Sequence, residues 1–209
     1  MDLVNRRCDT LDAAVESLET ELDRLNRASL SNNMIVLGVP TMQDENATDI
    51  CKTIASTVGC DLPKEAIKDV RRFHRTETGG KTPPIRVVFS EESFKQQIFD
   101  RKRSFGQLSV SSLGVLYAGA KGRITIRDEM TSLGLSMLRE VRENQEQLHL
   151  QYVWPGRQGA ILVKRQQNSK VEIIRTGDDI KKLLHTNSKR VLNASMTSSS
   201  FLEQSPKRR

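Results

Sequence analysis

The sequence predicts an α+β protein with an N-terminal coiled coil, a split βαβ domain and a small C-terminal α+β domain. Three observations favour this fold class. A heptad repeat of apolar residues opens the chain, a strand–helix–strand–strand–helix pattern follows it, and three short strands flanked by helices come last. We place the coiled coil at 1–30, the middle domain at 33–119, the C-terminal domain at 120–186 and a disordered basic tail at 187–209.

The composition excludes several classes of protein. Only 36% of the 209 residues are hydrophobic and 4% are aromatic, so we expect a modest core and long solvated segments. No apolar run approaches the roughly 18 residues of a membrane span, and no apolar signal sequence follows Met1. Cys8, Cys51 and Cys60 lack metal-ligand spacing and fit a reducing compartment. We therefore expect no cofactor, no metal and no membrane contact, and a cytoplasmic or also nuclear location.

The net charge of +7 is spread unevenly along the chain. Residues 1–31 carry a net charge of −3, residues 32–120 carry +2 and residues 121–209 carry +8. A strongly basic C-terminal part is typical of a protein that binds a polyanion, although many basic proteins bind nothing specific.

The first helix is expected over the apolar residues that recur at alternating spacings of four and three. These residues form an unbroken heptad seam with alternating a and d positions: Val4, Cys8, Leu11, Val15, Leu18, Leu22 and Leu25. A stripe of two residues in seven is narrower than the face that a helix packs on a globular core. Valine at a with leucine at d favours a parallel dimer, with a trimer as the alternative, so we expect self-association. The competing interpretation is a single amphipathic helix docked on the folded part of the chain.

The middle domain is expected to begin with a buried strand that Pro40 ends. A helix with an apolar face from Ile50 to Val58 follows, and two strands come next, near 67–75 and 84–89. A second helix spans 91–103, with Lys95 facing outward. With a weak final strand at 109–117, this is the split βαβ order that RNA-recognition domains (RRMs) adopt.

The middle domain lacks the aromatic residues with which an RRM stacks bases. Those residues stand on the exposed sheet face, and here Val36 and Arg86 take the two corresponding positions. A sequence-reading platform is therefore not expected, and only electrostatic contacts with a nucleic-acid backbone remain.

The C-terminal domain is expected to start with a strand at 123–127 and a helix to about residue 147, with Leu133 facing inward. Three short strands follow within residues 150–175, which hold the only tryptophan, Trp154, and a single acid. A cationic rim and an aromatic ridge suit a polyanion with bases to stack on. The same pattern also describes a half-buried sheet whose tryptophan belongs to the core. Of the two aromatics, we expect Tyr152 to be the more exposed.

The order of these parts resembles the baculovirus few-polyhedra (FP) protein family and the related first-open-reading-frame proteins of LINE-type (non-LTR) retrotransposons. Three segments carry the resemblance. Residues 33–40 follow the heptad helix, residues 124–131 lead a strand into a helix, and residues 152–165 join a Tyr–Trp strand to a basic one. The zinc finger that some relatives carry upstream has no Cys/His counterpart here, so the resemblance implies no metal.

The resemblance implies an oligomeric protein that coats or chaperones single-stranded RNA or DNA with little sequence preference, as in retrotransposon ribonucleoprotein particles. Our hypothesis is that several cationic sites neutralise phosphates and that Tyr152 stacks a base, which is worth roughly 1–3 kcal/mol on an exposed aromatic. The candidate residues are Arg71, Arg72, Arg75, Arg86, Lys121, Arg123, Arg127, Tyr152, Arg157, Lys164 and Arg165.

Two other functional classes compete with nucleic-acid binding. We expect no enzymatic activity, because no glycine-rich phosphate loop, metal pair or nucleophile–base set has persuasive spacing. Gly79–Thr82 resembles the end of a phosphate-binding loop, but position 75 holds arginine instead of the required earlier glycine. The stronger alternative is a non-enzymatic structural or adaptor protein, as in a baculovirus FP-like role, which acts through protein–protein contacts. Its binding would not fall steeply with salt.

Overall fold

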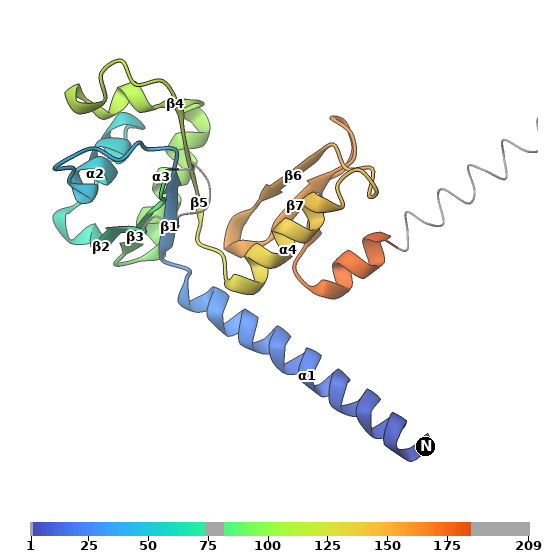
Figure 1. Cartoon of the computed structure of the whole chain (residues 1–209). Helices are drawn as coiled ribbons and strands as arrows, with labels where there is room; N and C mark the ends of the chain where they lie inside the picture. The colour runs from blue at the N-terminus through green and yellow to red at the C-terminus, as the bar shows by residue number, and fades with distance from the viewer. Residues whose placement is uncertain (1, 74–81, 185–209) are drawn as a thin grey trace, which may run out of the picture. The chain divides into compact units, whose positions relative to one another are not determined.

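The computed structural model describes residues 2–73 and 82–184, and these residues form two compact units (Figure 1). Unit 1 contains the chain up to residue 131 together with residues 156–159, and unit 2 contains residues 132–155 and 160–184. The predicted tail at 187–209, the glycine-rich loop at 79–80 and Arg75 lie outside the described residues. The protein is mixed α+β, as the sequence predicts. None of the helices within the described ranges combines the length and apolarity that a membrane crossing requires.

The chain opens with one continuous helix, α1, over Asp2–Ser29. The apolar seam of this helix is exposed within the part of the chain that the structure describes. Its least exposed large residues, Val15 and Leu25, are each 52% exposed, and Leu18 is 70% exposed. A helix docked on unit 1 through the seam would bury these side chains, so the described residues of unit 1 do not hold α1 by its seam.

The C-terminal end of α1 is attached to unit 1 through the helix face opposite the seam. Asp23 is only 7% exposed and accepts a hydrogen bond from the Thr131 hydroxyl. One turn later, Arg27 pairs with Asp23 and donates to the Gly159 carbonyl oxygen at 3.2 Å. Because Asp23 and Arg27 are not seam positions, this attachment leaves the seam uncovered.

Unit 1 is built on a five-stranded antiparallel sheet in the order β2-β3-β1-β5-β4. The strands are β1 (Asn33–Leu37), β2 (Ile67–Arg72), β3 (Ile85–Phe89), β4 (Leu108–Ser109) and β5 (Arg123–Asp128). Helix α2 (Ala47–Thr57) connects β1 to β2, and helix α3 (Glu92–Phe105) connects β3 to β4. Asn46 caps α2, because its side-chain oxygen accepts the backbone N–H of Thr48 at 3.0 Å.

The strand expected at 109–117 is wrong. Strand β4 covers only Leu108–Ser109, and two 3₁₀ turns, η2 (Val110–Leu113) and η3 (Val115–Tyr117), follow it. The strand expected at 123–127 does form, as β5, but it pairs with β1 and so belongs to the sheet of unit 1. Strand pairing is a non-local choice, because the partner strand lies some ninety residues away in the sequence.

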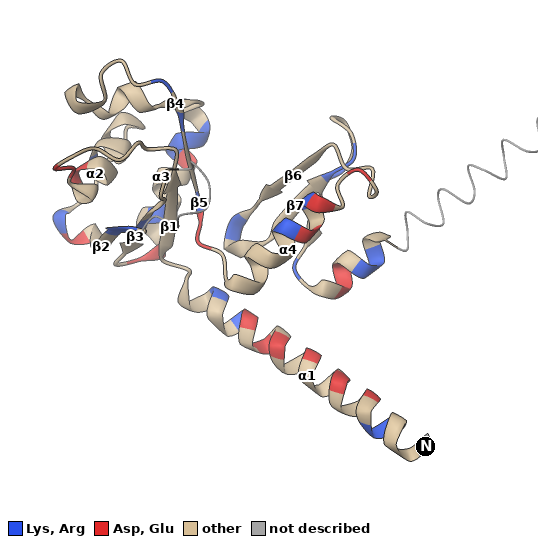
Figure 2. Cartoon of the chain, in the orientation of Figure 1, with Lys and Arg blue, Asp and Glu red and all other residues tan. Residues whose placement is uncertain are grey.

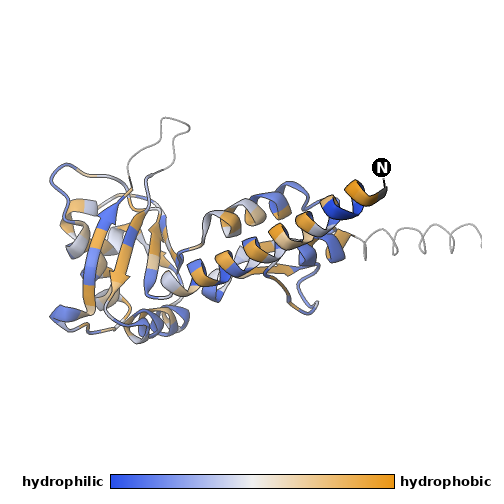
Figure 3. Ribbon diagram, turned by 90° about the horizontal axis from the view of Figure 1, so that it is seen from below, coloured by the Kyte–Doolittle hydropathy of each residue, from blue (hydrophilic) through white to orange (hydrophobic). Residues whose placement is uncertain are grey.

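Helices α2 and α3 cover one face of this sheet, and no described helix of unit 1 lies on the other face (Figures 1 and 3). The core on the covered face combines β1 residues Met34 and Val36 with Ile54 of α2 and Ile98 of α3, all at most 1% exposed. Val36 therefore points into the core, and the prediction that it stands on the exposed sheet face is wrong. Ile35 points to the other face of the sheet, although it is only 3% exposed.

Lys95 of α3 is buried at 1% exposure, so the prediction that it faces outward is also wrong. Its Nζ lies 2.8 Å from Oδ1 of Asp128, which is itself 4% exposed, and donates to the Ser31 carbonyl oxygen. The second oxygen of Asp128 accepts the backbone N–H of Gln158 at 2.7 Å. A buried lysine needs such an acidic partner, and the sequence does not show that Asp128 supplies it.

Unit 2 combines helix α4 (Ser132–Glu143), a three-stranded antiparallel sheet and a short helix over 177–184. The strands are β6 (Tyr152–Pro155), β7 (Ile161–Lys164) and β8 (Glu172–Ile174), in the order β6-β7-β8. The three strands confirm the expected meander. Leu133, expected to face inward from α4, is 42% exposed, and Leu138 is buried instead.

Candidate nucleic-acid interface

Three of the predicted arginines form one row across the sheet of unit 1, on the face without helices, which we call the open face. Arg71 of β2 stands opposite Arg86 of β3, Arg86 stands opposite Ile35 of β1, and Ile35 stands opposite Arg127 of β5. Directly opposed residues point to the same side of a sheet. Arg123 lies four residues before Arg127 on β5 and so shares this face. The cations of the sheet are blue in Figure 2.

Two acids share the open face and reduce its positive charge. Glu129 follows β5 and forms an ion pair with the Arg86 guanidinium at 2.8 Å, and it also accepts a hydrogen bond from the Asn33 side chain at 2.7 Å. Asp69 lies two residues before Arg71 on β2, which places it on the same face. Arg71 and Arg123 are the exposed arginines of the open face, whereas Arg86 is largely held by Glu129.

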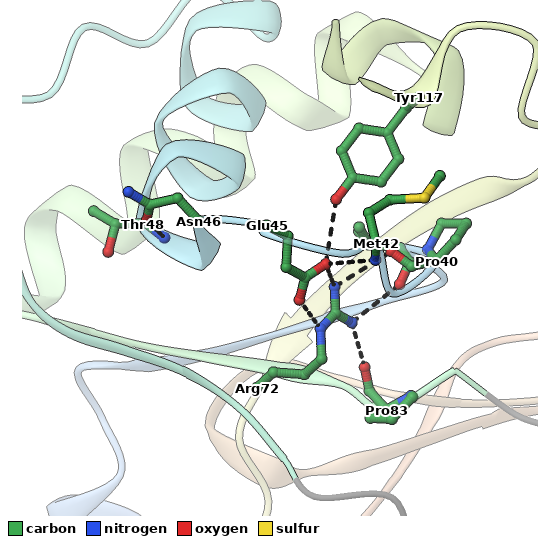
Figure 4. Close-up of polar contacts among 9 residues, drawn as sticks. Pro40, Met42, Glu45, Asn46, Thr48, Arg72, Pro83 and Tyr117 are labelled. Carbon is green, nitrogen blue, oxygen red and sulfur yellow. Dashed lines mark hydrogen bonds and ion pairs between the residues drawn. The ribbon is translucent and has the colours of Figure 1, made fainter. Parts of the chain in front are cut away.

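Arg72 points to the other face of the sheet, although it follows Arg71 directly. Its guanidinium forms an ion pair with Glu45, and both side chains are 12% exposed (Figure 4). It also donates to the backbone carbonyl oxygens of Val39 at 3.0 Å and Pro83 at 2.8 Å. These contacts join the loop before α2 to the sheet, so we assign Arg72 a structural role and leave it out of the interface.

Glu45 is the acceptor around which this cluster is built. Besides Arg72, it accepts the backbone N–H of Met42 at 3.2 Å and the hydroxyl of Tyr117 at 3.4 Å (Figure 4). Burial of the carboxylate favours its neutral form, but the hydrogen bonds from Arg72 and Met42 outweigh burial, so the pKa of Glu45 is lowered. Burial and the nearby Glu45 charge raise the pKa of Tyr117. Both groups are therefore locked in their ordinary charge states near neutral pH.

In unit 2, one face of the small sheet carries two aromatic side chains and a lysine. Tyr152 stands opposite Lys164, and Trp154 stands opposite Leu162, which in turn stands opposite Ile173. We call these five residues the aromatic face. Its two most exposed members are Ile173, at 55%, and Tyr152, at 40%. The buried strand residues Ile161, Val163 and Ile174 occupy the other face.

Tyr152 is more exposed than Trp154, as the sequence predicts, and Trp154 is half-buried. Leu162 and Ile173 were not predicted from the sequence as neighbours of the aromatics. The available signal was strand alternation, but it requires the register between strands, which a single sequence does not provide.

The remaining candidate cations have different surroundings. Arg165 contacts Glu172 at 3.2 Å and the Leu148 carbonyl oxygen at 2.9 Å, and its side chain is only 14% exposed. Arg157 forms an exposed ion pair with Asp100 at 2.7 Å. Lys121 is exposed on the segment that leads into β5. The structure thus brings Arg71, Arg86, Arg123 and Arg127 together on the open face and places Tyr152 beside Lys164.

Neither buried cysteine is suited to chemistry, because burial raises the pKa of the Cys51 thiol to about 12 and also raises that of Cys60. Across residues 2–73 and 82–184, no group of three or more His, Cys, Asp or Glu side chains is arranged to hold a metal ion.

Comparison with known proteins finds similarity in one part of the chain. A family model described as baculovirus FP protein domain 2 matches residues 131–184. Apart from Thr131 and the turn at 156–159, the matched residues are those of unit 2. No curated protein matches the chain. The similarity therefore supports the FP part of the resemblance and marks unit 2 as the part that carries it.

Proposed function

We propose that this chain is an oligomeric, non-enzymatic protein that binds single-stranded RNA or DNA with little sequence preference. The observation that carries the proposal is the convergence of Arg71, Arg86 and Arg127 on the sheet face of unit 1 that the described helices α2 and α3 leave free (Figure 3). Guanidinium groups pair well with phosphate oxygens, and contacts with phosphates carry no base information. The row spans three strand spacings, about 14 Å, which is enough to follow a nucleic-acid backbone.

The aromatic face of unit 2 supports the same proposal. Tyr152 offers an exposed ring beside the Lys164 ammonium, so a base can stack while a neighbouring phosphate meets a cation. Stacking is tolerant of sequence, because every base has a π-face. Each unit thus contributes one weak site, and joining such sites on one molecule raises the overall affinity.

We further propose that unit 1 is an RRM-like domain whose open face has exchanged stacking aromatics for arginines. The antiparallel order β2-β3-β1-β5, with a helix after β1 and after β3, supports this relation. We also propose that the exposed seam of α1 forms a parallel coiled coil. That combination resembles the LINE-type first-open-reading-frame proteins, in which we expect coating or chaperoning of the element's own RNA.

The test is binding of fluorescent, scrambled single-stranded RNA and DNA across a salt series. The variant Arg71→Gln/Arg127→Gln removes two cations of the row, and Arg24→Gln/Lys52→Gln removes two exposed cations from helices α1 and α2. Each lost phosphate contact lowers the slope of log K against log salt by about 0.7 for single strands, so the row variant loses about 1.4. The helix variant keeps the slope of the unaltered protein. A folded protein that binds neither nucleic acid at low salt refutes the proposal.

A second candidate function is that of a protein adaptor in an FP-like role. The match of unit 2 to FP domain 2 and the apolar row of Trp154, Leu162 and Ile173 favour it. Exposed apolar rows of this kind are typical of protein-docking surfaces. Under this alternative, Ile173→Ser abolishes capture of a protein partner, and the salt series shows no steep dependence.

A further inference from the structure

Unit 1 carries a second exposed feature that the proposed function does not use. Val115 and Leu116, in the 3₁₀ turn η3, are 95% and 64% exposed. We call this pair the apolar tip. Outside α1, these two are the most exposed large apolar side chains among the described residues of unit 1. Single exposed apolar residues are common on protein surfaces, and an adjacent pair offers a small contiguous apolar surface that a partner could bury.

The apolar tip is anchored by buried residues on both sides of it. Leu113 and Tyr117 are 7% and 2% exposed and anchor the two ends of the turn. The Tyr117 N–H donates to the Gly114 carbonyl oxygen at 3.0 Å, and the Tyr117 hydroxyl donates to Glu45, which Arg72 fixes in place (Figure 4). Gly114 has a backbone φ of +101°, a value that residues other than glycine rarely adopt. The apolar tip therefore stands on a turn that hydrogen bonds and buried side chains define.

The chain around the apolar tip is strongly cationic. Residues 101–127 contain six lysines and arginines and no aspartate or glutamate. Lys121 and Arg123 follow the tip and are exposed, and the cations around β4 are blue in Figure 2. Arg123 also belongs to the open face, so the tip lies next in sequence to the end of the arginine surface. The Glu45 carboxylate that Tyr117 contacts is paired with Arg72, so the exposed charges that follow the tip are those of Lys121 and Arg123, which are complementary to a polyanion with an apolar interior.

We infer that the apolar tip is a wedge that enters between stacked bases of a paired RNA or DNA stem and helps the protein to open it. Aliphatic side chains of nucleic-acid-binding proteins insert between base steps in this way, while flanking cations hold the phosphates. The inference rests on the proposed function, because the arginines of the open face would bind the strand that the wedge releases. The exposed cations Lys121 and Arg123, which follow the tip in the sequence, favour a nucleic acid over a lipid surface or a protein groove.

The experiment measures two activities of the full-length protein at equal protein concentration. Opening of a short hairpin is followed with a fluorophore and a quencher on its two ends, and binding of a scrambled single strand is followed by anisotropy. The variant Val115→Ser/Leu116→Ser removes the apolar surface, Leu116→Phe enlarges it, and Leu133→Ser is a matched control at an exposed leucine of unit 2. Circular dichroism spectra establish that all variants are folded.

We expect the double serine variant to bind the single strand normally and to reduce the open-to-closed ratio of the hairpin roughly tenfold, as burial of less than one leucine side chain would predict. Leu116→Phe increases the ratio, and Leu133→Ser leaves it unchanged. Normal hairpin opening by the serine variant overturns the inference and leaves the proposed function standing. If the unaltered protein binds the single strand normally but opens no hairpin, the inference is likewise overturned and the proposed function still stands. Loss of vesicle binding or of self-association in the serine variant, with opening intact, assigns the tip to another partner and also overturns it.

Discussion

Replacement of Lys95 by methionine is the most demanding test of how unit 1 is held together. Methionine has nearly the length of the lysine stem and removes the ammonium group alone. That ammonium is 1% exposed, lies 2.8 Å from Asp128 and donates to the Ser31 carbonyl oxygen. It thereby joins α3 to β5 and to the turn between α1 and β1.

The size of the effect follows from what the substitution leaves behind. Oδ1 of Asp128 faces the Lys95 ammonium, and Oδ2 is occupied by the Gln158 N–H at 2.7 Å. Without the lysine, a carboxylate that is 4% exposed keeps one hydrogen bond and no counter-ion. Removal of one partner from a buried ion pair costs about 3–5 kcal/mol, and we expect Lys95→Met to lower the free energy of unfolding by this amount.

The assay is urea unfolding followed in parallel by far-ultraviolet circular dichroism and by tryptophan fluorescence. Trp154 lies in unit 2, so its fluorescence reports that unit, whereas circular dichroism reports both. The double variant Lys95→Met/Asp128→Asn removes the stranded charge and keeps an oxygen for Gln158. We expect it to recover at least about 2 kcal/mol relative to the single variant. Lys52→Met, at an exposed site of α2, serves as the control and changes stability by no more than about 0.5 kcal/mol.

Two results would refute this reasoning. A cost of Lys95→Met below about 1 kcal/mol would mean that the ion pair is no better than a surface pair. A double variant as unstable as the single one would mean that the loss comes from packing of the lysine stem and not from the unpaired carboxylate.

Three further predictions follow from the structure. Gly38→Ala destabilises unit 1 by more than Gly59→Ala in urea unfolding: both positions have positive φ, which costs about 1–3 kcal/mol of strain, but only at Gly38 would a Cβ overlap a backbone carbonyl. Glu45→Gln lowers the free energy of unfolding most near neutral pH. Because the pKa of Glu45 is lowered in the folded protein, the ionised carboxylate stabilises the fold above the ordinary pKa of 4.5, and this stabilisation is lost as the pH falls through the folded-state pKa. The urea midpoints of the variant and the parent protein therefore converge in acid. Leu18→Asp places a charge on the seam of the proposed coiled coil, so we expect the mass measured by light scattering to fall to the 23.6 kDa of one chain. Thr20→Asp places the same charge outside the seam and leaves the mass of the oligomer unchanged.

The sequence by itself determined the local structure of this protein. The heptad spacing of α1 and the alternation in the strands of unit 2 depend on residues a few positions apart, so their periodicity was readable. The relative exposure of Tyr152 and Trp154 was also readable, because the smaller, hydroxyl-bearing ring is the one that tolerates water. Of the two positions expected on the exposed sheet face, the sequence placed Arg86 correctly and Val36 wrongly, because alternation shows which residues share a face but not which face is covered.

Tertiary structure alone decided which charged residues share a surface. Arg71 and Arg72 are adjacent, yet one joins the open face and the other an ion pair with Glu45, because successive strand residues point to opposite faces. Lys95 carries the same charge and is buried, since Asp128 meets it from a strand thirty-three positions away. Pairing of β5 with β1 brings both that aspartate and Arg127 into unit 1. Long-range partners of this kind leave no periodic trace in one sequence, because their selection depends on the packing of the whole sheet.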